Sequence, residues 1–195
     1  MGRKISRTIA QKFIDGIVLC NPDAEKWYNN SSKIKTFVFP IIQNEIVIEN
    51  KLNESEERAK AYINQLELVG KKVFLFVGRF SPEKNIEYLV KSFIKVSKQY
   101  DDLILLLVGD DGNTDGAIRK NIEMLVEESK TVNIRILGRK DGKDLFAIYN
   151  CGQVLVLPSI SEAFGAVTNE ALVAGEYVMI SKNAGSICLV TEENG

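Results

Sequence analysis

Two cationic side chains follow an apolar run in the segment Gly78-Arg79-Phe80-Ser81-Pro82-Glu83-Lys84-Asn85. This segment has neither the G-x-G-x-x-G pattern of a dinucleotide site nor a phosphate-binding P-loop. Ser81 before Pro82 predicts a helix start, with a capping residue and then proline at the first helical position. Arg79 and Lys84 would then flank a helix N-terminus, which is partly positive and stabilises a bound anion. The alternative is that both are solvated surface charges.

A second polar segment, Pro158 to Glu170, follows an apolar run and leads into a helical pattern that ends at Gly175. Gly165 predicts the turn from loop to helix, which places Glu162 in the loop and Glu170 one turn into the helix. The two carboxylates are eight positions apart and could accept sugar hydroxyl groups. The backbone N–H groups that would form a second anion site belong to Gly165, Ala166 and Val167. The alternative is a structural loop followed by an ordinary surface glutamate.

A third segment, Gly109-Asp110-Asp111-Gly112, also follows an apolar run. Its two acids could bind a cation, as in receiver domains. A receiver would also need an aspartate at the end of a later strand, and neither Leu137-Gly138-Arg139 nor Leu157-Pro158-Ser159 supplies one. A polar turn is therefore the favoured interpretation.

The composition excludes several other chemistries. The 195 residues include no histidine, which rules out Ser-His-Asp catalysis, Cys-His catalysis and histidine metal motifs within this chain. The three cysteines Cys20, Cys151 and Cys188 are far apart and odd in number, which predicts reduced thiols. A net charge of −1 argues against nucleic-acid binding by bulk charge. No apolar run is long enough to span a bilayer, and Met1 to Ala10 lack a signal-peptide core, so we expect a cytoplasmic protein.

Five short apolar runs predict the strands that would position the polar segments. They are Val73–Val77, Leu103–Val108, Asn133–Leu137, Val154–Leu157 and Tyr177–Ser181. Apolar residues at helical spacing lie between them, from Ile86 to Ile94 and from Ile118 to Val126. This alternation predicts an α/β fold with a doubly wound parallel sheet. Ligands of such sheets bind at the carboxyl ends of the strands, where all three polar segments would lie.

The first 70 residues have a different pattern. Met1 to Lys12 is basic and predicts a solvated helix face rather than a membrane anchor. Glu45 to Glu67 is acidic and predicts a connection followed by a helix, with a domain boundary near Leu68–Lys71. The other expected elements are strands at Ile17–Leu19 and Thr36–Phe39 and a helix at Asp23–Asn30.

Together these segments resemble the C-terminal, donor-binding domain of the family four glycosyltransferases, which are retaining enzymes of the two-domain GT-B type. The similarity covers Lys71 to Gly195 well and Asp15 to Pro40 faintly. It implies that residues 71–195 are a Rossmann-like nucleotide-sugar-binding domain and that residues 1–70 hold the end of an acceptor domain and the connection. The segments that carry it are Phe76-Val77-Gly78-Arg79 with Lys84-Asn85, Leu107-Val108-Gly109-Asp110, Ile136-Leu137-Gly138, and the E-x7-E signature in Leu157-Pro158-Ser159, Glu162-Ala163-Phe164-Gly165 and Glu170-Ala171-Leu172.

The sequence departs from the family pattern at several positions. Ala163 stands where glycine is usual, Glu176-Tyr177 where a proline usually precedes the fifth strand, and Ile187-Cys188 where Pro-Glu is usual. The family's sixth strand and closing helix would follow Asn194-Gly195. The chain therefore looks like an excerpt of a longer enzyme, and we expect little or no transferase activity from it alone.

The resemblance implies transfer of a hexose from a nucleotide diphosphate sugar, with the anomeric configuration retained and without a metal. Polysaccharide biosynthesis is the implied role of such a transfer. Arg79 and Lys84 would stabilise the leaving diphosphate, and Glu162 would hold hydroxyl groups of the transferred sugar; these three are the implied catalytic residues. Glu170 would hold the ribose, and the loop at Gly138-Arg139 would face the base. The full set of implied donor contacts is Gly78, Arg79, Lys84, Gly138, Arg139, Glu162, Phe164, Gly165, Ala166, Val167 and Glu170.

The implied partners are the nucleotide-sugar donor and a glycan or lipid-linked acceptor, which the missing N-terminal domain would bind. Nucleic acid is not an expected partner, and membrane association would be peripheral, at the inner face. Two other functions stay open from the sequence. One is a GT-B nucleotide-sugar epimerase or phosphorylase, and the other is a non-enzymatic, receiver-like phosphate-binding module.

Overall fold

The computed structural model describes residues 13–31, 34–112 and 116–195. It divides into two compact units, the first ending at Ile41 and the second running from Ile42 to Gly195. The basic segment Met1 to Lys12 lies outside the described residues.

The first unit is a small parallel β-α-β arrangement. Strands β1 (Gly16–Leu19) and β2 (Lys35–Val38) pair in parallel. Helix α2 (Pro22–Ser31) connects them along the chain. The helix starts where the sequence favours it, because the Asn21 side chain accepts a hydrogen bond from the Ala24 N–H at 2.8 Å, and Pro22 needs no partner at the first helical position. The two strands and the helix expected here are confirmed within a residue or two at each end.

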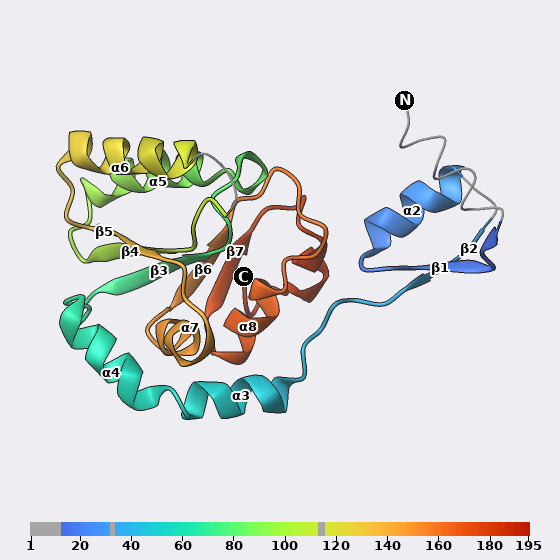
Figure 1. Cartoon of the computed structure of the whole chain (residues 1–195), viewed down its shortest axis with the longest axis horizontal. Coiled ribbons are helices and arrows are strands. Elements are labelled where there is room, and N and C mark those ends of the chain that lie inside the picture. The colour runs from blue at the N-terminus through green and yellow to red at the C-terminus, as the bar shows by residue number, and fades with distance from the viewer. Residues whose placement is uncertain (1–12, 32–33, 113–115) are drawn as a thin grey trace. The chain divides into compact units, whose positions relative to one another are not determined.

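A five-stranded parallel sheet forms the centre of the second unit (Figure 1), in the order β5-β4-β3-β6-β7. This confirms the predicted α/β fold. The central strands are buried on both faces, which is why their sequences are apolar nearly throughout. The strands are β3 (Lys72–Val77), β4 (Leu103–Val108), β5 (Ile134–Gly138), β6 (Val154–Leu157) and β7 (Tyr177–Ile180).

Helices cover both faces of this sheet (Figure 1). Helices α5 (Ile86–Ser97) and α6 (Ala117–Ser129) lie together on one face. Helices α7 (Gly142–Tyr149) and α8 (Val167–Val173) lie on the other. Each face has its own apolar cluster, so the sheet is doubly wound as expected.

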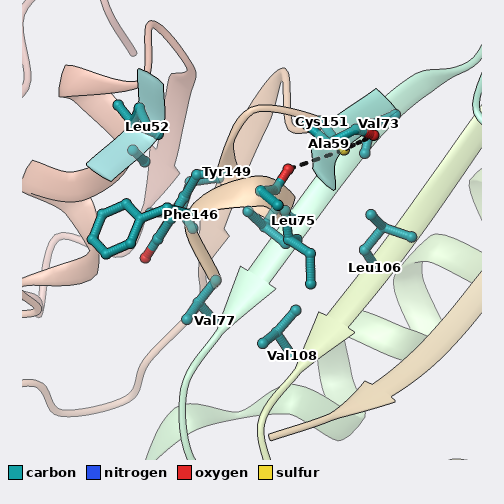
Figure 2. Packing of buried hydrophobic residues seen from close by; sticks show 14 of the residues in the cluster. Leu52, Ala59, Val73, Leu75, Val77, Leu106, Val108, Phe146, Tyr149 and Cys151 are labelled. Carbon is teal, nitrogen blue, oxygen red and sulfur yellow. Dashed lines mark hydrogen bonds between the residues drawn. The ribbon is translucent and has the colours of Figure 1, made fainter. Parts of the chain in front are cut away.

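The acidic stretch before the sheet folds into two helices, α3 (Glu45–Asn53) and α4 (Glu56–Gln65). The expectation of a connection followed by one helix was therefore wrong. Asn44 caps α3 by accepting the Val47 N–H at 3.3 Å, a start signal that the acidic composition concealed. Figure 2 shows Leu52 and Ala59 in one cluster with the strand residue Leu75. The second compact unit thus begins well before the boundary expected near Leu68–Lys71.

The connection after β3 also differs from its prediction. Pro82–Lys84 form a short 3-10 helix, and Asn85 then adopts a left-handed conformation with a φ of 55°, so α5 begins only at Ile86. The Ser81 side chain makes no capping hydrogen bond. Ser81 and Pro82 therefore do start a helical turn, with Ser81 at the N-cap position, but this turn is not the start of α5. Asn85, a residue type that tolerates left-handed backbone, separates the two.

Candidate functional site

The candidate site lies where the chain changes direction across the sheet. From β3 the chain runs outward to β4 on one side, and it later returns to form β6 on the other side of β3. In an open α/β sheet, the usual ligand site lies outside the carboxyl ends of the strands at such a switch point. The loops that follow β3 and β6 contact each other there: the Ile160 N–H donates to the Glu83 carbonyl at 2.8 Å, and the Asn85 side chain donates to the Pro158 carbonyl at 3.3 Å.

Lys84 and Glu162 form an ion pair across these two loops. Their side chains are only 16% and 14% exposed, respectively. The idea that Lys84 is a solvated surface charge was therefore wrong, since a carboxylate from a segment far along the chain neutralises it. A lysine ammonium has three donors, so Lys84 can keep this partner and still donate to a bound anion.

Arg79 lines a hollow of about 340 Å³ at the carboxyl ends of β3, β4 and β5. It is exposed, and no carboxylate lies within ion-pair distance of it in the described part of the chain. The hollow brings together residues that were expected to contact the donor with others that were not. Its polar and glycine lining consists of Gly78, Arg79, Gly109, Asp110, Gly112, Arg139 and Lys140.

A close backbone approach shapes the floor of this hollow. Gly109 has a φ of 143°, and a side-chain Cβ at this position would lie 1.8 Å from the carbonyl oxygen of Gly78. The Gly109 N–H donates to the Gly138 carbonyl at 3.0 Å, and the Gly78 N–H donates to the Val108 carbonyl at 3.0 Å. Only glycine fits at position 109, and the three loop starts are thereby fixed against one another.

Glu162 lies in the loop between β6 and α8, as predicted. The loop is fastened to the segment after β7, because the Gly185 N–H donates to the Glu162 carbonyl at 3.1 Å and the Ser186 N–H to the Phe164 carbonyl at 2.7 Å. Phe164 is 2% exposed, so its side chain anchors the loop in the core. Gly165, with a φ of 90°, makes the expected turn into α8.

Glu170 lies in the first turn of α8, as predicted, and both of its carboxylate oxygens already accept a hydrogen bond. The Tyr149 hydroxyl donates to Oε2 and the Gln43 side-chain amide donates to Oε1, each at 2.7 Å. Tyr149 is fully buried, and burial, followed by the charge of Glu170, raises the pKa of its hydroxyl well above the usual value. Tyr149 therefore remains a hydrogen-bond donor at neutral pH.

One of the departures from the family pattern, Glu176, is a buried carboxyl group at the start of β7. It is 3% exposed, and within the described residues neither carboxyl oxygen has a hydrogen-bond partner. Burial raises the pKa of Glu176 to about 9 and is also the main cause that raises the pKa of the nearby Cys151 thiol to about 11. Glu176 is therefore protonated at neutral pH.

The two acids after β4 have structural partners. The Gly112 N–H donates to Asp110 at 2.8 Å, and the buried Asp111 carboxylate accepts the Arg119 N–H of α6. This confirms the polar turn and does not favour a receiver-like module. Among the described residues, no three His, Cys, Asp or Glu side chains cluster as metal ligands would. No helix in the same part of the chain has the length and apolar character needed to cross a bilayer.

Three residues of the site were missed by sequence reasoning. Lys140 follows Arg139 directly and could have been included with it. Tyr149 is the last residue of α7, and from the sequence alone it is indistinguishable from an ordinary aromatic residue of the core. Gln43 lies 127 positions before Glu170, and no local pattern links the two.

The family "Glycosyl transferases group 1" matches residues 58–195. That match covers well over half of the chain. The chain belongs to this family. The group 1 assignment agrees with the resemblance seen in the motifs, and it fits a parallel sheet of the kind found in GT-B glycosyltransferases.

Individual relatives agree with the family assignment. An uncharacterised glycosyltransferase of Methanocaldococcus jannaschii is 31% identical over 122 residues, which are 63% of this chain and 30% of the relative. Sucrose-phosphate synthase from Thermosynechococcus elongatus has a TM-score of 0.74 at 33% identity, over 92% of this chain and 43% of that one. HepE of Anabaena, in complex with UDP and glucose, has a TM-score of 0.80 at 17% identity, over 97% of this chain and 50% of that one. The chain thus spans about a third to a half of these relatives.

Proposed function

We propose that this group 1 glycosyltransferase chain binds a nucleotide diphosphate sugar at the carboxyl edge of its sheet and supports retaining transfer of a hexose to a glycan or lipid-linked acceptor. Two observations carry the proposal: the largely buried ion pair of Lys84 and Glu162 between the loops after β3 and β6, and the exposed Arg79 in the hollow at the ends of β3, β4 and β5. Residues 71–195 would be the donor-binding part, and an acceptor domain would complete the enzyme.

The charges at this edge of the sheet suit a diphosphate leaving group. When the bond to the sugar breaks, negative charge develops on the β-phosphate, and fixed cations lower the energy of that state. Arg79 supplies an exposed guanidinium with donors suited to phosphate oxygens. Lys84 supplies an ammonium that Glu162 holds in place before the donor binds. The substrate phosphates need no metal for this role in the mechanism that we propose.

The two glutamates would contact different parts of the donor. Glu162 lies beside Lys84, where the transferred sugar would follow the phosphates, and would accept its hydroxyl groups. Glu170 has two hydrogen-bond donors already in place, but a carboxylate offers about four acceptor sites, so two remain for the ribose hydroxyl groups. The loop at Gly138-Arg139 would face the base. HepE, which has a similar fold, is in complex with UDP and glucose, and this favours a nucleotide-sugar donor as the ligand.

Binding measurements on the two glutamates test the proposal. In calorimetric titrations with UDP, GDP, ADP and the matching nucleotide sugars, Glu162→Gln should weaken binding of the nucleotide sugar more than binding of the nucleotide. Glu170→Gln should weaken both, because the ribose is common to them. The exposed Glu192 provides the control variant Glu192→Gln, which should change neither. Equal losses for both ligands in both site variants would contradict the separate roles.

A further inference from the structure

The chain enters the second unit through two hydrogen bonds to the first turn of α8. The Gln43 N–H donates to the Asn169 side-chain oxygen at 2.8 Å, and the Gln43 side-chain amide donates to Glu170 Oε1 at 2.7 Å. Asn169 is 9% exposed, so its oxygen depends on this partner. Gln43 comes just after the division between the two units at Ile41 and Ile42.

Local structure fixes the position of Gln43. The next residue, Asn44, caps α3, and Ile48 and Leu52 of that helix are buried in the core of the second unit. Gln43 therefore does not approach α8 from a free loop. Its amide is presented to Glu170 by a helix that is packed against the same unit.

The amide completes a pair of donors that hold one carboxylate in a single orientation. The last torsion of a glutamate side chain is broad and soft, so an isolated carboxylate samples many orientations. Tyr149 fixes Oε2 from the core side, and Gln43 fixes Oε1 from the other. Both donors are needed to define the plane in which the remaining acceptor directions lie.

We propose that Gln43 is a positioning residue for the ribose-binding carboxylate of Glu170, and that it couples the segment leading into the second unit to occupation of the donor site. This inference rests on the proposed function. By linkage, if the Gln43 contact strengthens ribose binding, ribose binding strengthens the Gln43 contact by the same factor. The segment at residues 41–44 would thus be held more firmly when the donor is bound.

The test compares a ribose ligand with one that lacks the hydroxyl groups. The diphosphate among UDP, GDP and ADP that binds best is titrated against its 2′,3′-dideoxy counterpart. Gln43→Met keeps the side-chain length and removes the N–H donor, while the backbone bond to Asn169 remains. Gln99→Met, at an exposed glutamine beyond α5, is the control.

In the unmodified chain the ribose form should bind more tightly, and Glu170→Gln should remove that preference. Gln43→Met should reduce it about three- to tenfold, the range expected for a hydrogen bond of ordinary strength, and binding of the dideoxy form should change less than twofold. A purely structural role would weaken both ligands alike. In hydrogen exchange, the backbone N–H of Gln43 should become more protected when the diphosphate binds. Pyrophosphate, which has no ribose, should leave its protection unchanged.

The outcomes separate this inference from the function on which it rests. Absence of binding by all three diphosphates would overturn the proposed function, and the inference with it. Loss of the ribose preference in Glu170→Gln but not in Gln43→Met would overturn the inference alone. Tighter ribose binding by Gln43→Met would also overturn it, because the amide would then compete with the ribose for Glu170.

Discussion

The ion pair between Lys84 and Glu162 should behave as a largely buried pair in unfolding experiments. Removing one partner from such a pair leaves an uncompensated charge in a poorly solvated place. We therefore expect Lys84→Met and Glu162→Gln each to destabilise the chain, and the double variant to be little worse than either single variant.

The exposures of the two side chains set the magnitude. Loss of one partner from a fully buried pair costs about 3–5 kcal/mol, whereas exposed pairs contribute about 0–1 kcal/mol. At 16% and 14% exposure the pair lies nearer the buried limit, so the coupling free energy should be about 2–3 kcal/mol. The pair between Lys143 and Glu54, with side chains 59% and 62% exposed, is the matched control and should couple by less than about 1 kcal/mol.

Denaturant unfolding of the four proteins in each double-mutant cycle measures these quantities. Coupling of about 2–3 kcal/mol for Lys84 and Glu162, well above that of the control pair, would support the structure of the ligand-free site. Additive effects of Lys84→Met and Glu162→Gln would refute the reasoning, because the two charges would then not stabilise each other.

Three further predictions concern other parts of the second unit. Glu176 has a pKa of about 9 in the folded chain against an ordinary value of 4.5, so the unfolded chain loses this proton first and the free energy of unfolding should fall as pH rises from about 5 to 9. This group changes the free energy of unfolding by at most about 1.4 kcal/mol per pH unit, and Glu176→Gln should remove that dependence. Denaturation curves at pH 5, 7 and 8.5 measure it. The same pH dependence in Glu176→Gln and the unmodified chain would contradict the buried carboxyl group. Gly109→Ala should destabilise the chain by at least about 2 kcal/mol, because its Cβ would overlap the Gly78 carbonyl; a melting temperature within a degree of the original would show that this approach is looser than described. Cys188 is exposed, whereas Cys151 is buried and its thiol has a raised pKa. Peptide mapping after brief treatment with a thiol reagent should therefore find Cys188 modified and Cys151 intact. Equal modification of the two would contradict the packing of Cys151.

The sheet could be predicted from the sequence because its information is local. Runs such as Leu103–Val108 are apolar throughout, and their spacing leaves room for one helix between successive strands. The start of α5 could not be predicted in the same way. Ser81 and Pro82 form a valid start signal, but the backbone turns left-handed at Asn85. The side chain of Asn85 donates to the Pro158 carbonyl of another loop, a long-range contact that no local pattern indicates.

The candidate site was predictable in its residue types and not in their pairings. Parallel strands bring their carboxyl ends to one edge, so Arg79, Lys84 and Glu162 could be assigned to that edge from the sequence. Which cation pairs with which acid depends on long-range packing, and no local pattern indicates that Lys84 and not Arg79 pairs with Glu162. The same is true of Gln43, whose contact with Glu170 follows from the packing of α3 on the second unit.

The most direct test of the central claim is a calorimetric titration of the chain with UDP, GDP and ADP in the presence of a chelator. We expect one of them to bind without added metal, and Arg79→Ala to weaken that binding by about 1.5–3 kcal/mol, the range for hydrogen bonds to charged groups. Arg135→Ala, at an arginine of β5 whose guanidinium donates to the Val132 carbonyl, should leave it unchanged. Unchanged affinity in Arg79→Ala, or binding that disappears with chelator and returns with magnesium, would contradict a diphosphate site built from this chain's own cations.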